Sequence, residues 1–153
     1  MTAVLQIVKN ATVHADGVLS GEIGRGLYIL LGVENGDCER DALLLAEKIA
    51  KLRIFSDDNG KMNLSVNDIG GDVMIVSNFT LGANYAHGNR PDYLNSARPD
   101  VAIPLYEYFI KLMSERVAKV ATGKFGAHME TSMITEGPVT IVMKSEVLSG
   151  GKK

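Results

Sequence analysis

Apolar and β-branched residues fill the first part of the chain in segments of strand length. Residues 3–8 and 11–15 predict strands, and Asp16-Gly17 predicts a hairpin turn before the short apolar segment at residues 18–20. Residues 27–33 form a continuous apolar run between glycine-containing turns, which predicts a central strand. The chain therefore opens as antiparallel β-structure.

The pattern changes to helical spacing after residue 37. Apolar residues recur there every three or four positions, so we expect a helix that packs against the sheet, with Asp37 as its N-cap. The apolar positions are Ala42, Leu45, Ala46, Ile49 and Leu52. A second helix is predicted between Pro99 and Val117, and Pro104 must either delay its start or bend its first turns. Its expected apolar stripe is Val101, Leu105, Phe109, Leu112 and Met113.

The remaining apolar segments are again of strand length. They predict strands at residues 73–76, 117–121, 129–134 and 139–143, and residues 149–153 are typical of a flexible tail. Strands outnumber helices and do not alternate strictly with them. This favours an α+β fold with a mostly antiparallel curved β-sheet or barrel and two main helices. The length of 153 residues suits a single domain, which we place at residues 1–148.

Composition narrows the classes of function. No run of about 18 apolar residues occurs and residues 1–6 lack the features of a signal peptide, so we expect a cytoplasmic protein without a membrane partner. The single Cys38 permits no internal disulfide and indicates a buried or incidental thiol. A net charge of −2 argues against bulk electrostatic binding of nucleic acid, although a local patch could hold a few phosphates. Candidate cations for such a patch are Lys9, Arg25, Arg53, Lys61, Arg90, Lys124 and Lys144.

Signals for a metal or a nucleotide cofactor are weak. The three histidines, His14, His87 and His128, are too scattered for a metal signature. The glycines at residues 24–26 and 70–71 do not complete a dinucleotide-binding motif and lead into strands, so they are typical of turns. We therefore expect no metal and no cofactor.

Two short polar segments interrupt strand-like stretches. The first, residues 77–81 (Ser-Asn-Phe-Thr-Leu), follows a buried run, where hydroxyls must find partners or face a ligand cavity. Ser77 and Thr80 are either structural hydroxyls or catalytic groups, and no base that could activate them stands nearby. The second segment, residues 135–140, contains Gly137-Pro138, where backbone atoms can be aimed outward because glycine is permissive and proline lacks an N–H.

These two segments resemble the paired signatures of the D-aminoacyl-tRNA deacylase family, Ser-Gln-Phe-Thr-Leu and Asn-x-Gly-Pro-Val-Thr. Asn78 stands here in place of the usual glutamine, and Thr135-Glu136 in place of Asn-x. Further resemblance runs through residues 21–24, 30–33, 53–55, 60–64, 90–91 and 122–129. The likeness therefore covers nearly all of residues 1–145.

The resemblance implies a homodimeric, metal-free hydrolase that removes D-amino acids, and mischarged glycine, from tRNA. In this family, hydrolysis depends on the terminal 2'-hydroxyl of the tRNA and on water rather than on a protein nucleophile. Thr80, beside Ser77, becomes a positioning residue, and backbone N–H groups near Phe79 and Thr80 are expected to bind the oxyanion. The expected substrate-binding residues are Asn78, Phe79, Phe125 and Met129.

The resemblance also implies a source of chiral selectivity. In the family, the carbonyl groups of a cis Gly-Pro bond, here Gly137-Pro138, project into the pocket of the other subunit and exclude an L side chain. From the residues alone, a trans bond in an ordinary turn is the alternative.

Two further readings of the function remain open. A family variant with shifted selectivity would follow from the shorter Asn78 and from Thr135-Glu136. A non-catalytic module that binds aminoacyl-tRNA or a small ligand on the same fold is the rival from another class. No DNA partner is expected.

Overall fold

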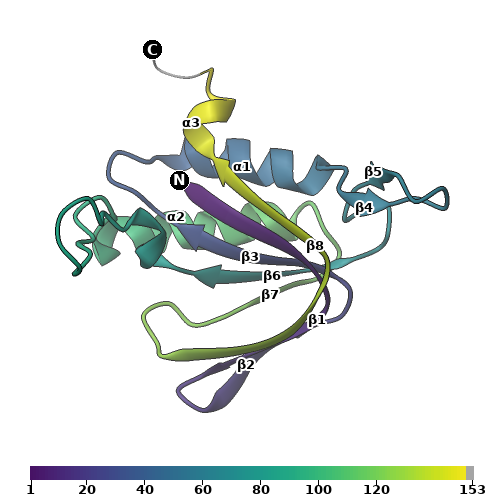
Figure 1. Cartoon of the computed structure of the whole chain (residues 1–153), viewed down its shortest axis with the longest axis horizontal. Helices are drawn as coiled ribbons and strands as arrows, with labels where there is room; N and C mark the ends of the chain where they lie inside the picture. Colours follow the sequence, from purple (N-terminus) through teal and green to yellow (C-terminus); the bar gives the residue numbers. More distant parts are fainter. Residues whose placement is uncertain (151–153) are drawn as a thin grey trace.

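The computed structural model describes residues 1–150, and one main sheet with two long helices on one face dominates it (Figure 1). Residues 151–153 of the expected tail lie outside the described residues. In chain order the elements are β1 (Thr2–Ala15), β2 (Val18–Ile23), β3 (Gly26–Gly32), α1 (Glu39–Lys51), β4 (Phe55–Ser56), β5 (Met62–Leu64), β6 (Asp72–Ser77), the 3-10 turn η1 (Phe79–Gly82), α2 (Pro99–Ser114), β7 (Val120–Thr122), β8 (Met129–Lys144) and α3 (Ser145–Leu148).

The main sheet is curved and mixed. Its strand order is β2-β1-β3-β6-β7, and β8 pairs with β1. β1 runs antiparallel to β2, β3 and β8, whereas β3, β6 and β7 are parallel because α1 and α2 lie in the connections between them. The predicted curved α+β fold is confirmed, with parallel pairing on one side of it.

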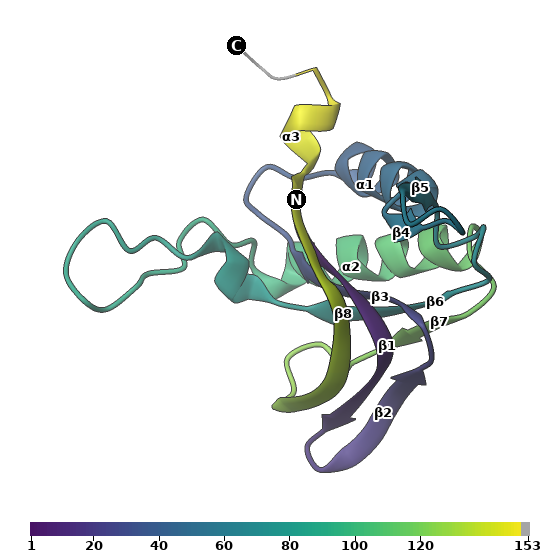
Figure 2. The ribbon, with the colours of Figure 1, turned by 45° about the vertical axis from the view of Figure 1, so that its right-hand side comes forward.

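The sheet curls until its two ends meet. Ser20 on β2 donates a hydrogen bond from its hydroxyl to the carbonyl of Thr122 on β7 (3.0 Å). Gly21 lies so close to β7 that a Cβ there would stand 2.8 Å from the same carbonyl oxygen, so only glycine allows this approach. Figure 2 shows β1 and β8 curving side by side along this barrel-like sheet.

Two pairs of predicted strands are continuous. Residues 3–8 and 11–15 both belong to β1, and residues 129–134 and 139–143 both belong to β8. The β1–β8 register jumps from Val8 opposite Thr135 to Gln6 opposite Thr140, so that residues 136–139 lie opposite Ile7 alone. This segment, the 136–139 loop, therefore bulges out of an otherwise regular pair of strands.

The first helix is confirmed with a different N-cap. α1 buries the expected apolar positions Ala42, Leu45, Ala46 and Ile49. Its N-cap is Cys38, which is exposed and whose N–H donates to the Asp41 carboxylate (3.0 Å), so the prediction of Asp37 was wrong. The Asp37 carboxylate instead accepts hydrogen bonds from the Met1 ammonium (2.5 Å) and from the Glu34 N–H (2.6 Å).

The second helix starts at Pro99, so Pro104 does not delay it, and Pro104 lies on the exposed side of the second turn. Val101 was assigned wrongly to the buried stripe, because it is 44% exposed. Ala102 and Tyr106 are buried in its place. Among residues 1–150, no helix combines the length and the apolarity needed to cross a bilayer.

Candidate active site

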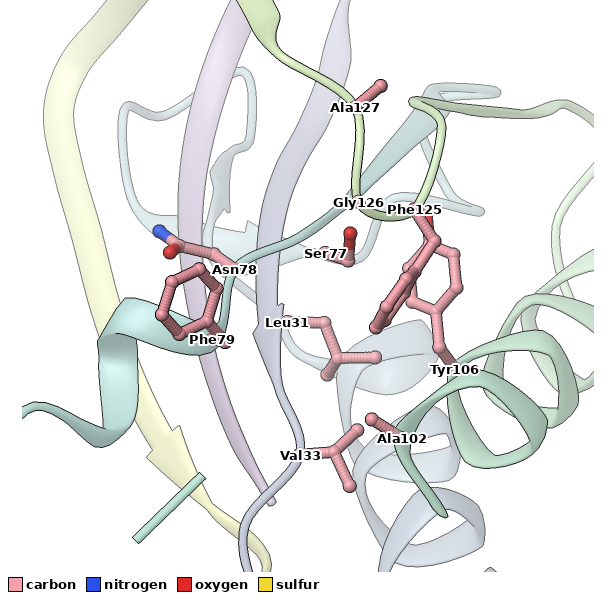
Figure 3. A pocket seen from close by; sticks show the side chains of 10 residues that line it. All are labelled: Leu31, Val33, Ser77, Asn78, Phe79, Ala102, Tyr106, Phe125, Gly126 and Ala127. Atoms are coloured by element: carbon pink, nitrogen blue, oxygen red, sulfur yellow. The ribbon is translucent and has the colours of Figure 1, made fainter. Parts of the chain in front are cut away.

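A cavity of about 190 Å³ opens where the parallel strands β3 and β6 end (Figure 3). The carboxyl ends of parallel strands meet at one edge of a sheet. At this edge the chain leaves β6 through η1, and the loop after β7 crosses over the cavity. Its lining residues are Leu31, Val33, Ser77, Asn78, Phe79, Ala102, Tyr106, Phe125, Gly126 and Ala127.

The cavity brings together only part of the predicted site. Ser77, Asn78, Phe79 and Phe125 line it, and the Ser77 hydroxyl points towards the loop that carries Gly126 (Figure 3). Met129 does not line the cavity. The Met129 side chain packs against a separate, smaller hydrophobic cluster that includes Val8, Ala11, Val13 and Met74. The position of Met129 therefore gives no support to a substrate-binding role.

Tyr106 and Phe125 form one wall of the cavity, opposite Asn78 and Phe79 (Figure 3). Their ring centroids lie 5.8 Å apart with the planes tilted by 56°. The Tyr106 hydroxyl donates to the carbonyl of Ile75 (3.0 Å), and burial raises the pKa of Tyr106 to about 12. The phenol therefore stays neutral at physiological pH and serves as a fixed wall rather than as a base.

Replacing Tyr106 with phenylalanine is expected to lower the free energy of unfolding by about 1 kcal/mol. The cost stays small because the Ile75 carbonyl keeps a second hydrogen bond, from the Gly123 N–H (3.1 Å). Urea denaturation measures this change, and Tyr108→Phe on the same helix is the matched control, since its hydroxyl makes no hydrogen bond within residues 1–150. A loss above about 3 kcal/mol would contradict this account of the wall.

Asn78 organises the turn at the mouth of the cavity. As the N-cap of η1, its side-chain oxygen accepts hydrogen bonds from the Thr80 N–H (3.1 Å) and from the Thr80 hydroxyl. The expectation that the Thr80 N–H is available to a ligand was therefore wrong. The hydroxyl proton of Thr80 is held by an amide oxygen, which is not a base, so this contact does not turn Thr80 into a nucleophile.

The backbone N–H of Phe79, unlike that of Thr80, has no hydrogen-bond partner among residues 1–150. Phe79 is the first residue of η1, where an N–H has no partner inside the turn, and no other group among residues 1–150 accepts a hydrogen bond from it. The ring of Phe79 is 58% exposed and meets Tyr93 edge-to-face, with centroids 5.1 Å apart. Ser96 fixes the same residue by donating its hydroxyl to the Phe79 carbonyl (2.6 Å). A rigid turn thus presents one free backbone donor.

Gly137 and Pro138 lie in the 136–139 loop and are exposed. Neither lines the cavity. Their peptide bond is cis, the isomer that the resemblance implies, and Gly137 has a φ of +127°, a conformation that other residues rarely adopt. One chain therefore does not bring the two polar segments together.

Comparison with known proteins decides the family. Residues 4–144 match the family described as D-Tyr-tRNA(Tyr) deacylase. This chain belongs to the D-aminoacyl-tRNA deacylase family. A D-aminoacyl-tRNA deacylase of Akkermansia muciniphila is 52% identical over 146 residues, which is 95% of this chain and 97% of that protein. One from Thermosipho africanus is 51% identical over 146 residues, again 95% of this chain and 98% of that protein.

A solved structure shows the same fold at lower identity. The structure of a c-Myc DNA unwinding element binding protein matches with a TM-score of 0.88 and 35% identity, over 94% of this chain and 98% of that chain. The predicted enzyme class, a D-aminoacyl-tRNA deacylase, is confirmed by the family match over residues 4–144 and by the two relatives of about 50% identity.

The two departures from the deacylase signatures have visible contacts in this structure. Asn78 caps η1, and Glu136 forms an ion pair with Arg25 (3.5 Å). Thr135 continues the strand by pairing with Val8. Within residues 1–150, no three His, Cys, Asp or Glu side chains gather closely enough to hold a metal ion.

Proposed function

We propose that this member of the deacylase family hydrolyses the ester bond of D-aminoacyl-tRNA in the cytoplasm, and so removes wrongly attached D-amino acids during translation. A single domain, residues 1–148, would carry the activity. The observation that supports this most strongly is the turn at the cavity mouth, where Asn78 and Ser96 fix η1 and leave the Phe79 N–H free. Such a preorganised donor is what a developing oxyanion requires.

In this mechanism the Phe79 N–H binds the carbonyl oxygen of the ester. Water adds to the carbonyl carbon, the bond to the 3'-oxygen of the tRNA breaks, and that oxygen takes up a proton. The Thr80 hydroxyl donates to Asn78, which leaves its lone pairs to accept a hydrogen bond from the substrate, and Ser77 lines the cavity below. The terminal 2'-hydroxyl of the tRNA supplies the polar group that positions the water, as the family resemblance implies, and the described residues that line the cavity include no His, Asp, Glu or Lys.

Chiral selectivity in this proposal comes from the 136–139 loop of a second copy of the chain. The loop is exposed and lies outside the cavity of its own chain, which is consistent with insertion into the cavity of a partner. Its carbonyl groups would exclude an L side chain and admit glycyl-tRNA, which has none. β8 pairs only with β1 among the described strands and exposes Met133, Ile134 and Val142, so it offers an apolar surface for a homodimer.

The homodimer is tested by sedimentation equilibrium of the purified chain. We expect a mass twice that of one chain, and Val142→Lys, on the exposed face of β8 (64% exposed), should shift the equilibrium towards monomers. Val101→Lys, at an exposed apolar position of α2 (44% exposed), is the control that should leave the mass unchanged. A fully active monomer would contradict the proposed origin of selectivity.

Multiple turnover of D-tyrosyl-tRNA distinguishes a hydrolase from a non-catalytic binding module. With substrate in tenfold excess over protein, the proposal predicts release of more than one equivalent of tyrosine per chain. A tRNA that ends in 2'-deoxyadenosine should bind with similar affinity and react far more slowly. Tight binding of D-tyrosyl-tRNA without release of tyrosine would favour the binding module instead.

A further inference from the structure

The 136–139 loop makes one polar side-chain contact with the rest of the described chain. At one end Val139 packs against the main hydrophobic core. At the other end the Glu136 carboxylate pairs with the Arg25 guanidinium (3.5 Å). The Gly137 and Pro138 between them have no polar side chain of their own, and proline has no N–H to donate. The path of the loop is therefore set by its two anchored ends.

Arg25 is held both at its backbone and at its guanidinium. It lies in the tight connection between β2 and β3, and its carbonyl accepts the N–H of Asp72 (3.0 Å). Its guanidinium stands 5.8 Å from the ring centroid of the buried Phe55. The Asp72 carboxylate also accepts the Gly24 N–H (2.8 Å), which fixes the preceding residue. Glu136 thus pairs with a guanidinium that also packs over a buried aromatic ring, on a residue whose backbone is fixed by Asp72.

This ion pair contributes little to stability, because both side chains are partly exposed (49% and 39%) and such pairs are worth about 0–1 kcal/mol. Its effect is on the direction in which the loop leaves β8. We propose that Arg25, acting through Glu136, is a positioning residue for the 136–139 loop and thereby helps to set the selectivity for D over L substrates. This inference rests on the proposed role of the loop in the function above.

The test compares D- and L-tyrosyl-tRNA hydrolysis by Arg25→Met, Glu136→Gln and the charge-reversed pair Arg25→Glu/Glu136→Arg. We expect each single variant to raise L hydrolysis roughly tenfold relative to D hydrolysis, since small misplacements of a positioning group change rates by one to two orders of magnitude. The reversed pair should recover most of the selectivity. Glu47→Gln removes the ion pair between Glu47 on α1 and Arg116 just after α2 (3.6 Å) and should leave the ratio unchanged.

Three results would overturn the proposal. The first is an unchanged ratio of D to L rates in folded single variants. The second is no recovery in the reversed pair although both single variants lose selectivity. The third is an equal rise of KM for both substrates at constant kcat, which would mean that Arg25 contacts tRNA phosphate instead.

The preference of the unmodified protein for the D ester distinguishes the positioning role of Arg25 from the proposed function. If the unmodified protein prefers the D ester and the Arg25 and Glu136 variants prefer it equally, only the positioning role falls. If the unmodified protein shows no preference, the proposed selectivity falls as well. Thermal unfolding of each variant verifies that a changed ratio does not reflect loss of the fold.

Discussion

Replacing Gly137 with alanine is expected to let this deacylase hydrolyse L-tyrosyl-tRNA, lowering its preference for the D ester by at least about tenfold, as for other changes in the shape of a specificity pocket. A Cβ at this position would stand 2.5 Å from the Val139 nitrogen and 2.8 Å from its Cγ2, which are closer than real contacts. The φ of +127° is also costly for alanine. The 136–139 loop must therefore shift, and its carbonyl groups no longer exclude the L side chain.

The ratio of initial rates for the two esters measures this effect. Gly60→Ala is the matched control, because Gly60 also has a positive φ (+73°) but meets no atom within 4 Å of an added Cβ. Pro138→Ala is a second variant that removes the ring which restricts the backbone without adding an atom beside Val139. Retention of full selectivity in both loop variants, with the dimer intact, would rule out the loop as its source.

Replacing Phe79 with proline is expected to lower kcat by about 10²–10³ while the turn persists. The change removes the one free N–H of η1, which the proposed mechanism uses to bind the oxyanion. Proline suits the first residue of a helical turn, and Asn78 before it is already extended (φ −146°, ψ 94°), outside the α region that a following proline disfavours.

Phe79→Ala separates the N–H from the aromatic ring. This control loses the edge-to-face contact with Tyr93 but keeps the backbone donor, so we expect a raised KM with a smaller change in kcat. If the proline and alanine variants lose the same amount of kcat, the Phe79 N–H does not stabilise the transition state. Single-turnover kinetics make the comparison independent of product release.

Local patterns predicted most of the secondary structure and missed how the long strands continue. The apolar residues on both sides of residues 135–138 located the two halves of β8. They could not show that both halves pair with the same strand, because the β1–β8 register depends on contacts between opposite ends of the chain. Asp37 has the right chemistry for an N-cap, but a contact with the Met1 ammonium, distant in sequence, takes its carboxylate.

The candidate site was predictable where polar residues follow a buried strand. Ser77 was singled out in this way, and the resemblance added Asn78, Phe79 and Phe125, which also line the cavity. Tyr106 was missed, although its spacing from Ala102 and Phe109 places it on the buried face of α2. The bond from Thr80 to Asn78 could not be predicted, since it depends on the conformation of η1.

The most direct test of the proposed function is hydrolysis of D-tyrosyl-tRNA and L-tyrosyl-tRNA in parallel, at equal concentrations, with a catalytic amount of purified protein and a chelator present. We predict rapid turnover of the D ester and no release above background from the L ester. Equal cleavage of both esters would contradict chiral selection by the 136–139 loop, and cleavage of neither would contradict the proposed hydrolase.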